Sequence, residues 1–380
     1  MKPKLLIASD CFLPRWDGIA RFLTDIIPHL KDEYEITVVA PDFAGEQTPI
    51  NGIKIVRIPL LKNIKFGDYT PASFQSKTIE KLVLESDLVW IQTTASVGGL
   101  AANLAHKHKK PYGYYIHSID WMLVSRSLSP NNVFRKLFYW FSKKHAREVY
   151  NNAKLLMVPS GEVLEILRWN KVTTPCAVVK LGIDIDRFVP AKDKKKAKAA
   201  LSIDPQAYVV GYVNRISREK DILTLYRAFI SFSRKYQNAR LLVVGDGIAS
   251  LKNELSKHPN IILVGAKDNV IPYMQAMDVF VLTSLLETTS LATLEAMSCA
   301  VPVICTPVGL VKEYVREKEN GLLFPISNNL ILSLKLEWLA KNVEAQERIS
   351  KSARKTVIEE YSWASTVKHV KESLKTILYK

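Results

Sequence analysis

The chain has 380 residues, of which 48% are hydrophobic and 24% charged, and its formal net charge is +16. The length predicts two domains, and no apolar run approaches the roughly 20 residues that a membrane-spanning helix needs. The positive charge favours an anionic partner, which would be nucleic acid, a membrane surface or a phosphorylated substrate.

The first apolar run, LLIAS, is too short for a signal peptide, and Asp10 interrupts it, so we interpret it as a strand. The four cysteines have neither metal-binding nor redox spacing, which favours reduced thiols and a cytoplasmic location. They are Cys11, Cys176, Cys299 and Cys305.

Apolar runs alternate with amphipathic segments, which predicts parallel sheets covered by helices. In the first half the predicted strands are 5–9, 35–41, 53–59, 88–93, 111–117, 154–160 and 176–182. A basic segment, 190–206, interrupts the pattern. Predicted strands then follow at 208–213, 240–245, 260–265, 278–283 and 301–306. We therefore expect Rossmann-like domains at 1–185 and 186–360, with a terminal amphipathic helix at 361–380 that needs a surface to pack against.

Three loops after predicted strands contain candidate ligand-binding residues. Asp17 and Gly18 follow the first strand, where glycine allows close approach of backbone and a helix N-terminus favours an anion. The alternative there is a tight turn.

Arg215 and Lys220 precede a helix in the second domain, where two cations are unfavourable unless an anion such as a diphosphate binds them. The alternative is surface charge, with Glu219 neutralising Lys220.

Glu287 and Glu295 lie eight positions apart, at a strand end and on the following helix. Carboxylates accept hydrogen bonds from sugar hydroxyls, so one glutamate could hold a ribose and the other a hexose. Thr288, Thr289 and Ser290 add hydroxyl and backbone N–H groups between them. The alternative is two exposed glutamates stabilised by the helix dipole.

Three further features are less specific. Gly245 and Gly247 form a GxG after a strand, but GxGxxG follows neither first strand, which argues against a nicotinamide site. His117 ends a predicted strand and is either structural or a sugar-hydroxyl partner.

Residues 126–150 interleave aromatic and basic side chains, which favours an interfacial helix or, equally, a core helix with a basic edge. Four aromatic residues, Phe134, Phe138, Trp140 and Phe141, lie near Arg135, Lys136, Lys143 and Lys144.

Together these stretches resemble the retaining GT-B glycosyltransferases of glycosyltransferase family 4, over nearly the whole chain. Residues 287–303 are similar to the family pattern EGFGxxxLEAMAxGxPV, and 214–221 to GRLxxxKG. LVVGDG, KLGIDIDRF, YSW and FLPRWDGIAR also resemble recurrent family segments. The resemblance implies a GT-B fold, in which two Rossmann-like domains face each other across a cleft and a C-terminal helix packs back on the first.

The resemblance also implies roles for individual residues. Arg215 and Lys220 neutralise the donor diphosphate, Glu287 holds the transferred sugar and Glu295 holds the ribose. His117 lies near the reacting carbon. The remaining predicted donor contacts are Asp17, Gly18, Gly245, Thr289, Ser290 and Leu291. No metal or other cofactor is expected, because the basic pair replaces it.

The sequence departs from the family at ETTS, where Thr288 and Ser290 replace two glycines, and at Asp17, which replaces another. These changes make close backbone approach harder and leave the charged positions intact. We therefore expect a retaining, metal-independent hexosyltransferase that uses GDP-mannose or UDP-glucose. Its expected acceptor is lipid-linked, at the cytoplasmic face of a membrane contacted through 126–150.

The alternatives are a soluble sugar acceptor, a nucleotide-sugar epimerase, or a nucleotide-sugar-binding protein without catalysis. We expect no nucleic-acid partner, because no nucleic-acid-binding motif accompanies the charge.

Overall fold

The computed structural model describes residues 2–15, 17–45, 50–61, 70–117, 119, 121, 132–287 and 289–379, with only the backbone for 132–138. By their contacts these residues form two compact units. Unit 1 is Met1–Lys180 with Val367–Lys380, and unit 2 is Leu181–Thr366.

Unit 1 contains a parallel sheet of seven strands in the order β3-β2-β1-β4-β5-β6-β7. The strands are β1 (Lys4–Ala8), β2 (Glu35–Pro41), β3 (Lys54–Ile58), β4 (Leu88–Ile91), β5 (Tyr112–Tyr115), β6 (Leu155–Val158) and β7 (Cys176–Val178). Most are short, continuous apolar runs, as expected where helices cover both faces of a parallel sheet. The strand order reverses at the pair β1 and β4, where ligands bind in open α/β sheets.

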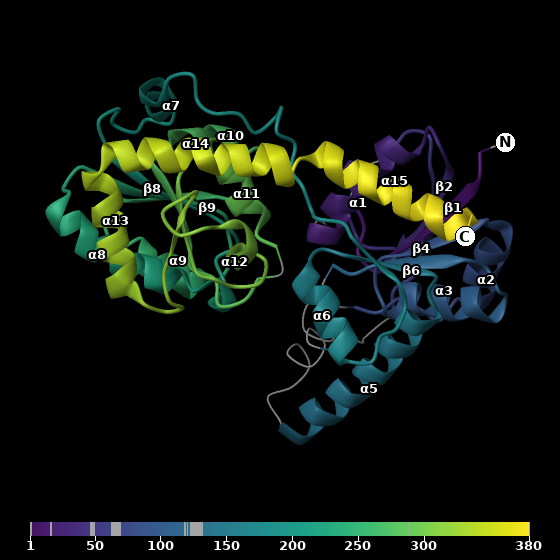
Figure 1. The fold of residues 1–380 in the computed structure, drawn as a ribbon. Coiled ribbons are helices and arrows are strands. Elements are labelled where there is room, and N and C mark those ends of the chain that lie inside the picture. The colour runs from purple at the N-terminus through teal and green to yellow at the C-terminus, as the bar shows by residue number, and fades with distance from the viewer. Residues whose placement is uncertain are drawn as a thin grey trace. The chain divides into compact units, whose positions relative to one another are not determined.

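Helices cover both faces of this sheet (Figure 1). They are α1 (Gly18–Leu30), α2 (Ser76–Glu85), α3 (Ser96–Lys107), α5 (Asn132–Asn152), α6 (Gly161–Trp169) and α15 (Trp363–Tyr379). Phe22 of α1 packs edge-on against Trp90 of β4, with ring centroids 6.0 Å apart. On α15, Lys371 binds Glu33 with an N–O distance of 2.8 Å. From Val367 onward the C-terminal helix therefore packs within unit 1.

Unit 2 contains a parallel sheet of six strands in the order β10-β9-β8-β11-β12-β13. The strands are β8 (Tyr208–Val213), β9 (Ala239–Val244), β10 (Ile261–Gly265), β11 (Val279–Leu282), β12 (Val303–Cys305) and β13 (Leu322–Leu323). Counted within the unit this is the order 3-2-1-4-5-6 of dinucleotide-binding folds, and it reverses at β8 and β11.

The helices of unit 2 also form two layers. They are α7 (Lys194–Ala200), α8 (Ile222–Lys235), α9 (Ala249–Leu255), α10 (Ile271–Ala276), α11 (Leu291–Ser298), α12 (Val311–Tyr314), α13 (Asn329–Lys341) and α14 (Val343–Glu360). One hydrophobic core holds side chains of α8, α9 and α13, and the other holds those of α10, α11, α12 and α14.

Each predicted strand is present, and the structure adds β13, which is too short to stand out from its surroundings in the sequence. The prediction of two parallel-sheet α/β domains is confirmed. All four cysteines are free.

Candidate active site

The candidate site of unit 2 follows the carboxyl ends of β8 and β11, where the strand order reverses. Arg215 and Lys220 lie in the loop after β8, and Glu287 and Ser290 lie in the loop after β11. The two strands pair directly. The topology therefore brings both loops to the edge where α/β sheets bind ligands.

Gly245 and Gly247 support the loop after β8 from the neighbouring strand β9. A Cβ at Gly245 would lie 2.0 Å from the carbonyl oxygen of Asn214, and one at Gly247 would lie 2.1 Å from that of Ile216. Only glycine allows this approach. The N–H of Gly245 donates to the carbonyl of Gly265 at 2.9 Å. Gly245 therefore has a packing role in the structure, and its predicted donor contact stays a prediction.

Lys220 ends a short 3-10 turn, Arg218–Lys220, that leads into α8. Asp221 follows in the left-handed region with φ of 44°, which aspartate tolerates better than most residues. Its Oδ2 accepts hydrogen bonds from Thr224 Oγ1 at 2.8 Å and Ser327 Oγ at 2.9 Å. The Asp221 side chain, next to Lys220, is thus held by two hydroxyl groups.

The loop after β11 is hydrogen-bonded to this turn. Thr283 Oγ1 donates to the carbonyl of Lys220 at 2.8 Å, and the Leu285 N–H donates to the carbonyl of Glu219 at 2.8 Å. The backbones that carry the two sets of candidate residues are therefore fixed to each other.

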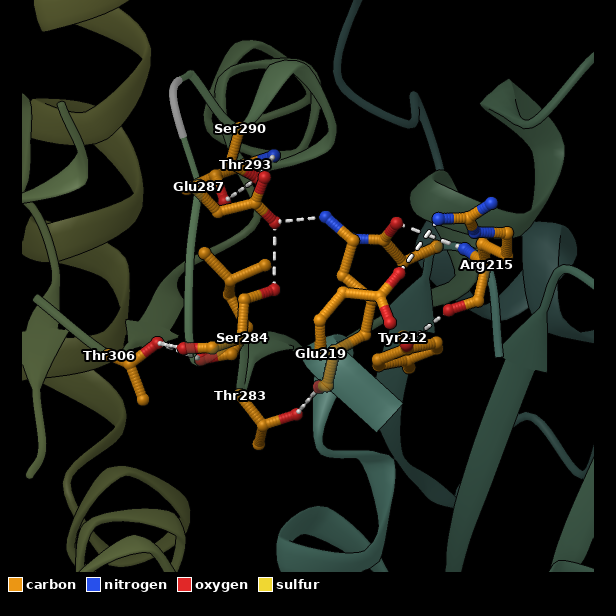
Figure 2. Close-up of polar contacts among 12 residues, drawn as sticks. Tyr212, Arg215, Glu219, Thr283, Ser284, Glu287, Ser290, Thr293 and Thr306 are labelled. Carbon is orange, nitrogen blue, oxygen red and sulfur yellow. Dashed lines mark hydrogen bonds and ion pairs between the residues drawn. The ribbon is translucent and has the colours of Figure 1, made fainter. Parts of the chain in front are cut away.

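Lys220 and Glu287 form an ion pair with an Nζ–Oε1 distance of 2.6 Å, and their side chains are 16% and 10% exposed. Ser284 Oγ donates to the same oxygen at 2.7 Å (Figure 2). Ser284 is fully buried, and its carbonyl accepts from Thr306 Oγ1 at 2.7 Å. The sequence analysis missed Ser284. Its signal is a hydroxyl residue directly after the apolar strand.

Arg215 pairs with Glu219, with an N–O distance of 2.7 Å and side chains 63% and 45% exposed (Figure 2). The suggestion that Glu219 neutralises Lys220 is therefore wrong. Burial acts to raise the pKa of Glu219, but its hydrogen bonds and the Arg215 charge prevail and lower it. Both predicted diphosphate cations thus have a carboxylate partner.

Ser290 caps the N-terminus of α11. Its Oγ accepts from the Thr293 N–H at 3.4 Å and from Thr293 Oγ1 at 2.8 Å. Thr289 precedes the cap, and Leu291 opens the helix. Thr288 lies outside the described residues. Backbone N–H groups at a helix N-terminus favour an anion, which is compatible with the donor contacts predicted for these positions.

Glu295 lies on α11 and is 2% exposed. Burial first, and then the Glu295 charge, raise the pKa of the Cys299 thiol on the next helical turn to about 12. Because Glu287 is also largely buried, the alternative of two solvent-exposed glutamates is wrong. The predicted ribose role of Glu295 stays a prediction.

In unit 1, Asp17 caps α1 and accepts from the N–H groups of Ile19 at 3.0 Å and Ala20 at 2.9 Å. Arg15 lies 3.5 Å from the other Asp17 oxygen. Gly18 is the first helical residue, and a Cβ there would have no atom within 4 Å. A tight turn therefore does not explain this glycine.

His117 follows β5, and its Nε2 lies 2.8 Å from Gln92 Oε1. The ring packs against Phe22 and Tyr115, with centroid distances of 5.1 and 4.5 Å. Burial lowers the pKa of His117 to about 3. The imidazole is therefore neutral at physiological pH.

The sequence analysis treated Asp10 only as an interruption of an apolar run. The residue is 1% exposed and accepts from Thr93 Oγ1 and Ser96 Oγ, both at 2.6 Å. It also accepts from the N–H groups of Val97 at 2.8 Å and Gly98 at 3.1 Å. Asp10 thus fixes the start of α3 to the end of β1, at the point where this sheet also reverses its strand order.

The middle of α5 exposes aromatic side chains. Trp140 and Phe141 are 56% and 55% exposed. Lys144 Nζ lies 5.6 Å from the Trp140 ring centre, and Lys143 Nζ lies 5.6 Å from that of Tyr139. The end of the helix is buried through Ala146, Val149 and Tyr150. Residues 126–131 and the side chains of Phe134, Arg135, Lys136 and Phe138 lie outside the described part.

Across the described residues, no group of three or more His, Cys, Asp or Glu is arranged to hold a metal ion. Among the same residues, no helix has the length and apolar character needed to cross a membrane.

Two family models match this chain. Residues 16–187 match Glycosyltransferase Family 4, and residues 193–356 match Glycosyl transferases group 1. An alpha-monoglucosyldiacylglycerol synthase of Acholeplasma laidlawii is 25% identical, with 91% of this chain and 90% of that protein covered. A GDP-mannose-dependent alpha-mannosyltransferase of Corynebacterium glutamicum is also 25% identical, covering 88% and 80%.

Solved structures share the fold at lower identity. HepE of Anabaena, crystallised with UDP, superposes with a TM-score of 0.77 at 20% identity, covering 99% of this chain and 100% of that one. A sucrose-phosphate synthase of Thermosynechococcus elongatus has the same TM-score at 18% identity, covering 99% of each. The chain is therefore a glycosyltransferase of the GT-B type, built from a Glycosyltransferase Family 4 domain followed by a Glycosyl transferases group 1 domain.

Proposed function

We propose that the chain transfers a hexose from a nucleotide-diphosphate sugar, with retention of anomeric configuration and without a metal ion, to a lipid-linked acceptor. The observation that carries this proposal is the largely buried Lys220–Glu287 pair beside Arg215, at the carboxyl ends of β8 and β11. A cation for phosphate and an acceptor for sugar hydroxyls lie there side by side.

The donor diphosphate is assigned to Arg215 and Lys220. Arg215 offers a planar fork of donors, and Lys220 offers a compact charge on a flexible stem. Glu287 accepts hydrogen bonds from hydroxyls of the transferred sugar, and Glu295 from the ribose. N–H groups of 289–291 lie close to phosphate or sugar. The roles of Asp17, Gly18 and His117 stay predictions.

Transfer breaks the bond between the anomeric carbon and the donor phosphate oxygen. With retention, the acceptor hydroxyl attacks from the same face, and the leaving phosphate oxygen takes its proton. Negative charge grows on the diphosphate as this bond breaks. Cations bound to the diphosphate stabilise such charge where it develops, which is the work that a metal ion does in other transferases. Arg215 and Lys220 therefore supply the main electrostatic assistance.

The names of the relatives support the choice of donor and acceptor. The Corynebacterium relative is called GDP-mannose-dependent, and the Acholeplasma relative a glucosyldiacylglycerol synthase. We therefore propose GDP-mannose or UDP-glucose as donor and a glycerolipid-type hydroxyl as acceptor. A soluble sugar acceptor is the second candidate.

A lipid acceptor requires a membrane contact, which we assign to the exposed middle of α5. Trp140 and Phe141 form an edge-on pair with ring centroids 5.0 Å apart. Lysines beside aromatic rings are typical of helices that lie in a membrane interface, where the rings insert and the cations bind anionic headgroups.

A transfer assay tests the proposed function. Labelled UDP-glucose and GDP-mannose are each incubated with vesicles that contain diacylglycerol, and the lipid phase is counted. We expect label in lipid from one donor, with at least a ~10²-fold lower rate for Arg215→Ala. The exposed, same-unit variant Lys235→Met serves as control. Hexose released into water, or an altered nucleotide sugar formed without acceptor, would replace this function with hydrolysis or epimerisation.

Donor binding is measured separately by thermal shift with UDP, GDP, ADP and their hexose conjugates. A ligand at about 100 times its dissociation constant stabilises a fold by roughly 2.7 kcal/mol. We expect a shift with one base that weakens in Glu295→Gln. An equal shift in that variant would remove the ribose assignment.

Vesicle flotation tests the membrane contact. We expect binding to phosphatidylglycerol vesicles that falls at high salt and is lost in Trp140→Ser with Phe141→Ser. Trp169→Ser is the matched control, because this tryptophan is 88% exposed on a different helix, α6. Equal loss in both proteins would rule out a specific contact through α5.

A further inference from the structure

Lys220 and Glu287 satisfy each other in the structure, although the proposed function gives them different ligand groups. Glu287 Oε1 takes both the Lys220 ammonium at 2.6 Å and the Ser284 hydroxyl at 2.7 Å. No described residue hydrogen-bonds the second Glu287 oxygen. A diphosphate that binds Lys220 must therefore compete with a carboxylate already in place.

The two ends of this ion pair differ in freedom. Ser284 is fully buried and its carbonyl is held by Thr306, so the hydroxyl that binds Glu287 is fixed. The Lys220 ammonium is carried on a flexible four-carbon stem. When the pair opens, Glu287 therefore keeps its place on Ser284 while the ammonium moves.

We propose that Lys220 exchanges partners during the reaction. The Lys220 ammonium leaves Glu287 and binds the donor diphosphate. Glu287 keeps its hydrogen bond from Ser284, and the carboxylate oxygen that Lys220 has left accepts hydrogen bonds from the sugar hydroxyls. The proposal rests on the proposed function, because the diphosphate and sugar assignments come from it.

The exchange has a consequence for the order of affinities. A nucleotide sugar breaks the ion pair, but its sugar hydroxyls then donate hydrogen bonds to Glu287 in place of Lys220. A nucleoside diphosphate breaks the same ion pair and has no sugar hydroxyls to replace Lys220 at Glu287. The pair therefore weakens binding of the product nucleotide relative to the donor. After sugar transfer, Glu287 recovers Lys220 and assists release of the diphosphate.

Calorimetric titration of UDP against UDP-glucose, and of GDP against GDP-mannose, tests the exchange. Glu287→Gln keeps the shape and the acceptor for Ser284 but removes the competing charge. We expect it to bind the nucleoside diphosphate about five- to tenfold more tightly than wild type, the size of effect that a partly buried charge pair supports. The same variant loses most of the preference for the nucleotide sugar.

A double variant separates exchange from general repulsion. In a Lys220→Met background, Glu287→Gln should give no gain in nucleoside diphosphate affinity, because no ammonium remains to be released. A gain of the same size in that background would show repulsion between Glu287 and phosphate and would overturn the exchange. Unchanged affinity in Glu287→Gln alone would also overturn it.

Glu219→Gln provides the matched charge change on the exposed pair with Arg215, and we expect a gain below about twofold there, since solvent screens that pair. A gain as large as that of Glu287→Gln would contradict a specific role for Lys220. If wild type binds neither nucleotide nor nucleotide sugar, the proposed function itself fails. That result is distinct from binding without exchange.

Ser284 is a positioning residue in this scheme, and Ser284→Ala tests it. We expect the ratio of nucleotide-sugar affinity to nucleoside diphosphate affinity to fall several-fold, because the anchor serves only the sugar. A structural defect would weaken both ligands equally and leave the ratio unchanged, which would remove Ser284 from the proposal.

Discussion

Among the described residues of unit 2, two lysine–carboxylate pairs are largely buried on both sides, and they lie at opposite ends of one sheet. At the starts of β8 and β11, Lys198 Nζ lies 2.7 Å from Asp278 Oδ2, with side chains 7% and 11% exposed. At the carboxyl ends of the same strands, Lys220 lies 2.6 Å from Glu287, with 16% and 10% exposed. Distance and burial are nearly the same.

The pairs differ in what else they bind. Lys198 also donates to the carbonyl of Ala207 at 2.7 Å, and Asp278 Oδ2 also accepts the Val209 N–H at 2.7 Å. The Lys220–Glu287 pair has no backbone partner at its charged atoms among the described residues. A buried ion pair whose charged atoms also bind backbone groups has a structural role. A buried ion pair without such backbone partners can still form hydrogen bonds with a ligand.

The largest effect that this comparison predicts is on stability, in Lys198→Met. Asp278 would lose its near cation and keep only the more distant Lys194, and removing one partner of a buried pair typically costs about 3–5 kcal/mol. We expect the free energy of unfolding to fall by that amount in urea titrations. Lys194→Met is the control, because its ammonium lies 3.8 Å from Asp278 Oδ1 and its side chain is 37% exposed. Equal losses of unfolding free energy in the two variants would mean that the close contact of Lys198 with Asp278 adds no stability beyond that of the distant Lys194.

The second prediction concerns the pair at the other end of the sheet, where we expect a large effect on turnover and a smaller effect on stability. Lys220→Met should lower turnover by about 10²-fold or more, because it removes a positive charge where the leaving group becomes negative. Its unfolding free energy should change less than that of Lys198→Met. Lys198 also donates to the Ala207 carbonyl, whereas among the described residues the Lys220 ammonium binds only Glu287. Steady-state transfer rates and urea titrations on the same preparation measure both. If Lys220→Met lost as much stability as Lys198→Met and kept normal turnover, the Lys220–Glu287 pair would be structural and not catalytic.

The sequence predicted the sheets well because apolar runs and their alternation are local properties. Residues 208–213 and 278–283 were both recognised as strands, and their loops were recognised as sites. Ion-pair partners are set by topology instead. Glu219 was weighed as the partner of Lys220, its neighbour in the chain, but β8 and β11 are adjacent and bring Glu287 to Lys220.

Buried hydrogen-bond anchors were missed for the same reason. Asp10 and Ser284 each follow a strand. A donor to Asp10 lies far along the chain at Val97, and although Ser284 binds Glu287 only three residues away, its carbonyl is held by Thr306 after β12. A single polar residue after an apolar run is too common to identify its partner. The strand-end position could have made both residues candidates, and only the fold supplies the contacts.

The third prediction extends the comparison to His117 in unit 1, a half-buried polar side chain that contacts Gln92. Its pKa is about 3, below the ordinary value near 6.5. Between these values the unfolded chain binds a proton that the folded chain does not. The stability contributed by neutral His117 is full above pH 6.5 and is lost as pH falls towards 3.

His117→Gln should therefore flatten the pH dependence of unfolding below pH 6.5 by up to about 1.4 kcal/mol per pH unit. Urea titrations at pH 6.5, 5.5 and 4.5 measure the slope, with the exposed His106→Gln as control. A slope identical to wild type would show that water reaches the His117 ring more freely than its packing against Phe22 and Tyr115 indicates.

The smallest effect is expected at the exposed pair of Arg215 and Glu219. Water surrounds both side chains, and exposed pairs of this kind contribute about 0.2–1 kcal/mol. Glu219→Gln should lower the free energy of unfolding by less than about 0.5 kcal/mol, and the difference should vanish at high salt. The three pairs would then rank by completeness of their surroundings, although their N–O distances agree within 0.1 Å. A loss at Glu219 as large as at Lys198 would mean that the short contact distance, and not burial or backbone support, sets the strength of these pairs.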